Sequence, residues 1–484
     1  MKKLSLLDSM FLLMDNEEQK MHVLSYFMFE KPRSCPDDYM NKLVQEVRKH
    51  PWPFPHFRDK VSRSLGSLGL YYWDTDFNMD MKHHVQYAKA PGKGTAKDLR
   101  DYTTDYEAES LDYSRPLWEL RIIDGLEDSN QFAIVMKVHH SGIDGVSAMN
   151  MLEELLRVDP SDYSNPDMAS KKKQQNSKAR KVSKVSKVSF VKSLQVYLKG
   201  LKQVIGGIRT GESMLLPPKG KVPITRFNEV VAPTRSFATV SLSLPEVNAL
   251  SKATGGTVND VVSAIIGTGM HRYLEGKGEV LDKSLYATMP VSLHTDGDMD
   301  ESNKISMTCY PLASDVKNPS KQIRTIQKFT RKAKDEMKEL PQSVMTSLMA
   351  LGAIPILIKK IRGVRKIDPR LMTNVMISNV PSFKEPRYYK GSKLLGLHPL
   401  SLIMDGIGIN ITVSSYIDSL DFGLASDKTM APDIELICDH MVDAMEEMKA
   451  EILGEQVNKI KAAIALHTID YLASEGGKKS ASAV

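Results

Sequence analysis

Two adjacent histidines stand in the stretch most suited to chemistry, His139-His140-Ser141-Gly142-Ile143-Asp144-Gly145. The stretch follows an apolar run over residues 132–138, which predicts a β-strand ending where a glycine-containing loop begins. Neighbouring residues of a strand point to opposite faces. His140 is therefore expected to share a face with the bulkier apolar side chains of the strand, and His139 to lie on the other face.

An imidazole at the end of an apolar face stays neutral near pH 7 and can accept a proton. We therefore predict that His140 is a general base and that His139 has a supporting structural role. Asp144 is expected to hold the loop by accepting hydrogen bonds or pairing with an arginine, while Gly145 lets the loop turn tightly. Because the two histidines point apart and no further ligands stand nearby, no metal site is expected. Paired histidines on their own are more often structural than catalytic, so the wider pattern decides between the two interpretations.

The heptapeptide matches the HHxxxDG pattern of CoA-dependent acyltransferases related to chloramphenicol acetyltransferase and to the condensation domains of peptide synthetases. Further stretches, in order along most of the chain, resemble the bacterial wax ester synthase/acyl-CoA:diacylglycerol acyltransferases. They are Leu4-Ser5-Leu6-Leu7-Asp8, Met21-His22-Val23, Pro116-Leu117-Trp118, Thr257-Val258-Asn259-Asp260-Val261-Val262, Met289-Pro290-Val291-Ser292, Ser378-Asn379-Val380-Pro381 and Gly408-Ile409-Asn410-Ile411-Thr412.

This resemblance implies an α/β fold of two chloramphenicol-acetyltransferase-like domains, with an active-site tunnel between them. It also implies transfer of a long-chain fatty acyl group from acyl-CoA to a fatty alcohol, giving a wax ester, or to diacylglycerol, giving triacylglycerol. Neither a metal nor a redox cofactor is required by such enzymes. No Gly-x-Ser-x-Gly sequence is present, which argues against an acyl-serine intermediate and favours direct attack with His140 as the base.

Five further site residues follow from these motifs and their surroundings. Asn259 is the candidate donor to the tetrahedral oxyanion, although asparagine is also a preferred helix N-cap, and capping is the stronger expectation. Trp118 and Asp15 match family positions tied to activity and are predicted to bind substrate, with simple packing an equal alternative for Trp118. Gly352 and Ala353 lie in a small apolar stretch that would leave room for an alkyl chain, and helix packing explains that stretch nearly as well.

The order of elements predicts an α/β chain of several units. Residues 1–165 are expected to form the domain that carries the histidines, 166–230 a basic linker with an amphipathic helix, 231–455 a second acyltransferase-like domain, and 456–484 a helical extension with a disordered tail. Helices are predicted at 102–111, 149–157, 258–273, 321–337 and 433–451. Strands are predicted at 117–124, 131–140, 235–244, 284–291 and 304–311, with more between 374 and 425.

The basic charge is concentrated in one segment. Residues 168–210 hold 12 Lys/Arg and no Asp/Glu, so the rest of the chain carries 6 − 12 = −6. Apolar residues recur every three or four positions over 190–208, which predicts an amphipathic helix. This helix is expected either to pack on the protein itself or to touch a membrane or lipid-droplet surface. Nucleic-acid binding is not expected, because aromatic residues are not interleaved with the basic ones.

We expect a cytoplasmic protein, free or at the periphery of the inner membrane or of lipid droplets. Three widely spaced cysteines indicate a reducing compartment, and no apolar stretch is long enough to span a bilayer. Asp8 interrupts the apolar run that follows Lys2 and Lys3, so no export signal is predicted. Two alternatives stay open: a condensation-type enzyme that takes acyl groups from a carrier protein, and a non-catalytic protein that binds lipid surfaces.

Overall fold

The computed structural model describes residues 2–52, 56–63, 71–143, 145–166, 213–218, 220–292, 305–340 and 372–454, together with residues 199, 202, 206, 207 and 344. The predicted amphipathic helix at 190–208 and the extension at 456–484 lie outside the continuous stretches that it describes.

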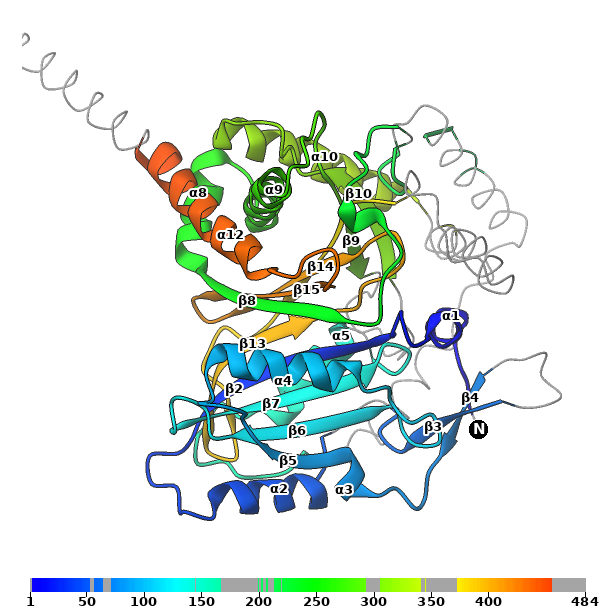
Figure 1. Ribbon diagram of the computed structural model, residues 1–484, viewed down its shortest axis with the longest axis vertical. Helices are drawn as coiled ribbons and strands as arrows, with labels where there is room; N and C mark the ends of the chain where they lie inside the picture. The colour runs from blue at the N-terminus through cyan, green and yellow to red at the C-terminus, as the bar shows by residue number, and fades with distance from the viewer. Residues whose placement is uncertain are drawn as a thin grey trace, which may run out of the picture.

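Two six-stranded sheets and one small sheet carry the fold (Figure 1). The first large sheet has the order β12-β13-β2-β7-β6-β5, and the second has the order β10-β9-β11-β14-β15-β8. The first consists of β2 (His22–Glu30), β5 (Val85–Lys89), β6 (Trp118–Asp124), β7 (Gln131–His139), β12 (Tyr388–Tyr389) and β13 (Ser392–Leu400). The second consists of β8 (Arg235–Ser243), β9 (Tyr286–Ser292), β10 (Ile305–Pro311), β11 (Val375–Pro381), β14 (Ile409–Tyr416) and β15 (Ser419–Asp427). The small sheet joins β1 (Lys2–Lys3), β4 (Tyr71–Thr75) and β3 (Asp59–Arg63).

Helices cover both large sheets, which confirms the predicted α/β class. The N-terminal helices are α1 (Leu6–Met14), α2 (Tyr39–Lys49), α3 (Met81–His84), α4 (Ala96–Ala108) and α5 (Gly145–Leu155). The C-terminal elements are η1 (Arg226–Asn228), α8 (Leu244–Thr254), α9 (Val258–Gly276), α10 (Pro319–Glu339), α12 (Glu435–Met448) and the π-helical η3 (Lys449–Leu453). In Figure 1, α8, α9 and α12 lie over the second sheet, and α4 lies over the first. The helices and strands predicted between 102 and 451 are confirmed. The helix predicted from 102 begins six residues earlier, at Ala96, and the other ends are shifted by up to four residues.

Side-chain caps explain where two of these helices begin. Thr95 accepts from the Asp98 N–H while the Asp98 side chain accepts from Thr95, and the same reciprocal pair forms between Thr257 and Asp260. Such capping boxes satisfy N–H groups that have no partner inside the helix. They fix the first turns of α4, which contacts β8, and of α9, which packs against α8, α10 and α12.

Strand β7 lies inside the first sheet and is buried on both faces. Phe132, Ile134, Met136 and Val138 pack into the N-terminal core, whereas Ala133 belongs to the core cluster that extends into the C-terminal sheet. This is the two-faced strand that the alternation predicted. Strand β7 pairs with β2 along one edge and with β6 along the other, so the end of β7 is held from both sides.

The C-terminal half of the chain contributes two strands to the N-terminal sheet. Strand β13 pairs antiparallel with β2, with Leu400 opposite Leu24 and Lys393 opposite Glu30. In Figure 1, β13 lies on the side of the first sheet that is nearest to the second sheet. The two halves of the chain are therefore joined by shared sheet pairing as well as by packing.

The contact between β13 and β15 leaves no room for a side chain at Gly423. A Cβ placed there would lie 1.9 Å from the carbonyl oxygen of Pro399, which is backbone and cannot rotate away. We expect Gly423→Ala to lower the free energy of unfolding by about 1–3 kcal/mol or more, because overpacking forces backbone shifts. Thermal unfolding checks this.

The matched control is Gly276→Ala at the end of α9, where an added Cβ would meet no atom within 4 Å. Alanine is the better helix former, so this variant should unfold at the same temperature or higher. Equal unfolding temperatures for the two variants would contradict the predicted clash.

Candidate active site

The paired histidines lie where β7 leaves the sheet. His139 is the last residue of β7 and pairs with His22 of β2, and its N–H donates to the carbonyl of Leu117 (3.0 Å). The N–H of His140 donates to the carbonyl of Met21 (2.8 Å). The main chain is therefore fixed up to the first residue of the loop.

The imidazole of His140 is half-buried and stacks on Phe11 of α1. The ring centroids are 4.4 Å apart and the planes are inclined by 24°. The Phe11 ring covers one face of the imidazole and fixes the orientation of the His140 ring, and the role of His140 as general base stays a prediction. The sequence pattern gave no indication of Phe11, because α1 is separated from the histidines by more than 120 residues.

His139 is fully enclosed, with 1% of its surface exposed. Its Nδ1 lies 3.1 Å from the backbone N of Ser141 and 2.8 Å from the Ser141 hydroxyl. A backbone N–H can only donate, so Nδ1 is the acceptor and the ring hydrogen is assigned to Nε2. Burial lowers the pKa of His139 well below its usual value, and the nearby His22 and His140 lower it further. His139 is therefore held neutral, which agrees with the expected structural role.

A tyrosine that the motifs did not reveal links His139 to Asp15. The Tyr113 hydroxyl lies 3.3 Å from His139 Nε2 and donates to Asp15 Oδ2 (2.7 Å). Asp15 Oδ1 accepts from the Met21 N–H (2.7 Å). Both carboxylate oxygens of Asp15 thus have protein partners, and its predicted contact with substrate stays a prediction. Tyr113 lies in a loop with no periodic pattern around it, so no sequence signal could identify it.

The loop after the histidines meets the second domain. Asp144 lies outside the described residues, and its predicted role stays a prediction. Gly145 begins α5, and a Cβ added there would come within 3.4 Å of a Val380 methyl group on β11. The end of the HHxxxDG stretch therefore contacts the strand that carries Ser378-Asn379-Val380-Pro381.

Asn259 belongs to the same region, but it does not cap α9. Thr257 is the N-cap, so the capping interpretation of Asn259 is wrong: the threonine–aspartate box already occupies that position. Asn259 Oδ1 instead accepts a hydrogen bond from Asn379 Nδ2 on β11. Two motifs far apart in sequence therefore meet at one side-chain pair, beside the strand residue that Gly145 approaches.

Trp118 lies inside the N-terminal core with 2% of its surface exposed. Its indole N–H donates to the carbonyl of Phe57 (2.9 Å), and its ring stacks on His84 at 4.6 Å. This placement suits the packing alternative, and substrate binding by Trp118 stays a prediction. Gly352 and Ala353 lie outside the described residues.

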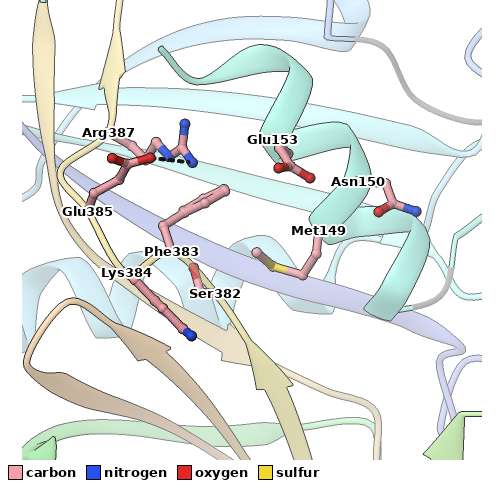
Figure 2. Close-up of a pocket in the computed structure, with 8 residues that line it drawn as sticks. All are labelled: Met149, Asn150, Glu153, Ser382, Phe383, Lys384, Glu385 and Arg387. Carbon is pink, nitrogen blue, oxygen red and sulfur yellow. Dashed lines mark ion pairs between the residues drawn. The ribbon is translucent and has the colours of Figure 1, made fainter. Parts of the chain in front are cut away.

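A hollow of about 530 Å³ opens between α5 and the segment after β11 (Figure 2). It is lined by Met149, Asn150, Glu153, Ser382, Phe383, Lys384, Glu385 and Arg387. Arg387 pairs with Glu385 (3.3 Å) and lies over the Phe383 ring, so its charge is already compensated. Two acidic and two basic residues line the hollow, and none of them belongs to the heptapeptide.

Neither a metal-binding cluster nor a membrane-spanning helix is seen among the residues that the structure describes. Among those residues, no group of three His, Cys, Asp or Glu side chains is arranged to hold a metal ion. Within the same ranges, every helix is too short or too polar to cross a bilayer.

Comparisons with known proteins agree with this geometry. Residues 4–262 match the model of the wax ester synthase/diacylglycerol acyltransferase catalytic domain, and residues 301–449 match that of the WS/DGAT C-terminal domain. The O-acyltransferase WSD of Acinetobacter baylyi is 29% identical over 463 residues, which cover 94% of this chain and 99% of the relative. A probable diacylglycerol O-acyltransferase of Mycobacterium tuberculosis is 30% identical over 460 residues, covering 92% and 98%.

Solved structures give the same result. The wax ester synthase/diacylglycerol acyltransferase of Marinobacter aquaeolei superposes with a TM-score of 0.70 at 27% identity, covering 93% of this chain and 100% of that one. The first condensation domain of the calcium-dependent antibiotic synthetase, at 12% identity, shares the fold with a TM-score of 0.59 over 93% and 97% of the two chains. With both family models matched and relatives aligned along nearly their whole length, the chain belongs to the wax ester synthase/diacylglycerol acyltransferase family of O-acyltransferases.

Proposed function

We propose that this chain transfers a long-chain fatty acyl group from acyl-CoA to the hydroxyl of a fatty alcohol or of diacylglycerol, with His140 as the general base. The family supports the reaction, and one observation supports the residue: the two histidines have different surroundings. His139 is enclosed with its ring nitrogens hydrogen-bonded to Ser141 and Tyr113. His140 is only half-buried, at the start of the loop.

The proposed reaction needs no covalent enzyme intermediate. His140 takes the proton of the acceptor hydroxyl as that oxygen attacks the thioester carbonyl and forms a tetrahedral intermediate. The intermediate collapses with cleavage of the C–S bond, and the protonated imidazole returns the proton to the CoA sulfur. An ester and free CoA leave, and His140 is neutral again.

The developing oxyanion needs a hydrogen-bond donor, and Asn259 is the candidate. Its Oδ1 already accepts from Asn379, so only its NH₂ group remains to donate. The pairing also fixes the direction of that group, since the amide cannot turn over without losing the bond. Preorganised donors of this kind stabilise the transition state without reorganisation.

Because the proposed substrates are apolar, we expect the reaction to take place at the periphery of a membrane or lipid droplet. The basic segment 168–210 has the charge that suits an anionic lipid surface. A carrier protein as acyl donor is the less favoured alternative, because it draws only on the fold shared with condensation domains at 12% identity.

Replacing His140 by Ala should lower turnover roughly 10²–10⁴-fold, because the hydroxyl then loses its proton acceptor. The measurement is release of free CoA from palmitoyl-CoA with hexadecanol and with diacylglycerol in parallel, and the better acceptor names the product. His440→Ala, on α12, is the control and should keep full activity. Near-normal turnover in His140→Ala would overturn the assignment. If folded wild-type protein releases no CoA with either acceptor, the carrier-dependent or non-catalytic alternative gains.

Asn259→Ala should lower turnover roughly 10²–10³-fold, because it removes a donor to the oxyanion. The unfolding temperature should fall only slightly, because a single partly exposed hydrogen bond to Asn379 is lost. Thr257→Ala is the matched variant two residues away: it removes the cap of α9 and should cost about 1 kcal/mol of stability while sparing turnover. The reverse pattern, with Asn259→Ala unstable but active, would assign Asn259 to structure alone.

The acid limb of the kcat/KM profile should follow a single proton. Only the neutral imidazole accepts the hydroxyl proton, so activity rises with pH as His140 loses its own proton. Burial lowers the pKa of His139 well below the usual value, so His139 stays neutral through this range and adds no second step. A limiting slope of two below the optimum would show that both histidines titrate and would contradict this assignment.

A further inference from the structure

We propose that Tyr113 is a positioning residue that, together with Asp15, fixes the imidazole of His140 for proton transfer. The inference rests on the proposed role of His140. It also gives Asp15 a role other than direct contact with substrate.

Asp15 is connected to the surroundings of His140 by three hydrogen bonds. Its backbone N–H donates to the carbonyl of Phe11 (3.1 Å), whose ring stacks on His140. Its Oδ1 accepts from the N–H of Met21 (2.7 Å), whose carbonyl accepts from the N–H of His140. Its Oδ2 accepts from Tyr113. Asp15 is therefore hydrogen-bonded to the residue that stacks on His140, to the residue whose carbonyl accepts from the His140 N–H, and to Tyr113.

Tyr113 supplies the third connection by joining Asp15 to His139. Its ring stands edge-on to His139, with centroids 6.0 Å apart and planes at 78°, and its hydroxyl lies within reach of Nε2. Burial and the Asp15 carboxylate raise the pKa of Tyr113, so the hydroxyl keeps its hydrogen and donates it to Asp15. The oxygen is then the acceptor for the Nε2–H of His139.

The hydrogen bonds that lead from Ser141 through His139 and Tyr113 to Asp15 all run in one direction. Ser141 N–H donates to His139 Nδ1, His139 Nε2–H donates to Tyr113, and Tyr113 O–H donates to Asp15. An ionised carboxylate only accepts, so Asp15 is a fitting end for such a chain. His139 is thus locked in one tautomer and one ring orientation, and His140 follows it directly in the chain.

The role proposed for Tyr113 concerns the position of the His140 imidazole and not the stability of the fold. A general base must stand about 2.6–3.2 Å from the proton it removes, and a displacement of about 1 Å can cost roughly 10²-fold in rate. Loss of the hydrogen bond from Tyr113, one of the three that Asp15 makes, should displace the His140 imidazole by less than about 1 Å. The expected signature is a lower kcat with unchanged KM, because the proposed role of Tyr113 is to orient the imidazole and not to bind either substrate.

The test begins with Tyr113→Phe, which removes the hydroxyl and keeps the ring. We expect kcat to fall about 10-fold, KM for palmitoyl-CoA and for the better acceptor to stay within about 2-fold, and the unfolding temperature to equal that of the control. The control is Tyr87→Phe on edge strand β5, a tyrosine with the same 38% exposure and an aspartate, Asp124, acting on its hydroxyl. It should match wild type in every respect. Wild-type kcat in Tyr113→Phe would overturn the proposal.

A second arm tests whether Tyr113 and Asp15 act through the same series of hydrogen bonds. In Asp15→Asn the amide oxygen can still accept from Met21, so its NH₂ group faces Tyr113 and the tyrosine hydrogen loses its acceptor. The double variant should therefore lose no more activity than Asp15→Asn alone. Multiplying effects would show that the two residues act independently and would overturn the shared role.

A third arm needs no catalysis. The rate at which diethyl pyrocarbonate modifies His140, followed by mass spectrometry, should rise several-fold in Tyr113→Phe and not in Tyr87→Phe, because the imidazole is less firmly held against Phe11. An unchanged rate would refute the positioning role. If wild type proves inactive while this rate still rises, the proposed function fails and the positioning of His140 by Tyr113 stands.

Discussion

The pairing of β2 with β7 is the constraint on which the site depends. In this register His22 stands opposite His139, and the carbonyl of Met21 receives the N–H of His140. A slip of one residue would turn every side chain of β7 to the other face, placing His140 where His139 is enclosed. The register is well specified because the two faces of β7 carry different side chains, large apolar ones on one and Ala133 with Lys137 on the other.

Strand β2 also connects the two halves of the molecule. Its other edge pairs with β13, so the same strand that positions the histidines holds a segment from the C-terminal half. Buried charges reinforce the connection: Glu107 at the end of α4 lies 3.6 Å from both His22 of β2 and Arg235 of β8. Burial alone would raise the pKa of Glu107, but the hydrogen bond from His22 and the charges around it lower that pKa. A carboxylate that stays ionised between two strands of different sheets needs both partners, since an unpaired buried charge is costly.

Sequence patterns predicted local structure and motif chemistry better than side-chain partnerships. The strand that ends at the histidines and the helix beginning at Val258 follow from periodicity that the chain itself carries. Phe11 and Tyr113 could not be inferred, because each reaches a histidine only after distant segments pair. Asn259 shows the limit of local rules: asparagine is a good cap, yet Thr257 takes that position and the asparagine pairs with Asn379 on β11, a strand more than 100 residues away in sequence.

The site also depends on a charge buried beneath it. Lys137 lies two residues before His139 on the same face, is fully buried, and donates to the carbonyls of Tyr106 (3.0 Å) and Glu109 (2.9 Å). Burial lowers the pKa of Lys137 to about 8, partly offset by Glu119, so the group is mostly charged at neutral pH. A cation at carbonyls of a helix C-terminus is favourable. It fixes the end of α4, and Tyr113 follows four residues after Glu109. Lys137 and His139 lie on the face of β7 opposite His140. The lysine fixes the start of the loop that carries Tyr113, and His139 is hydrogen-bonded to Tyr113. The residues of this face therefore orient the imidazole of His140.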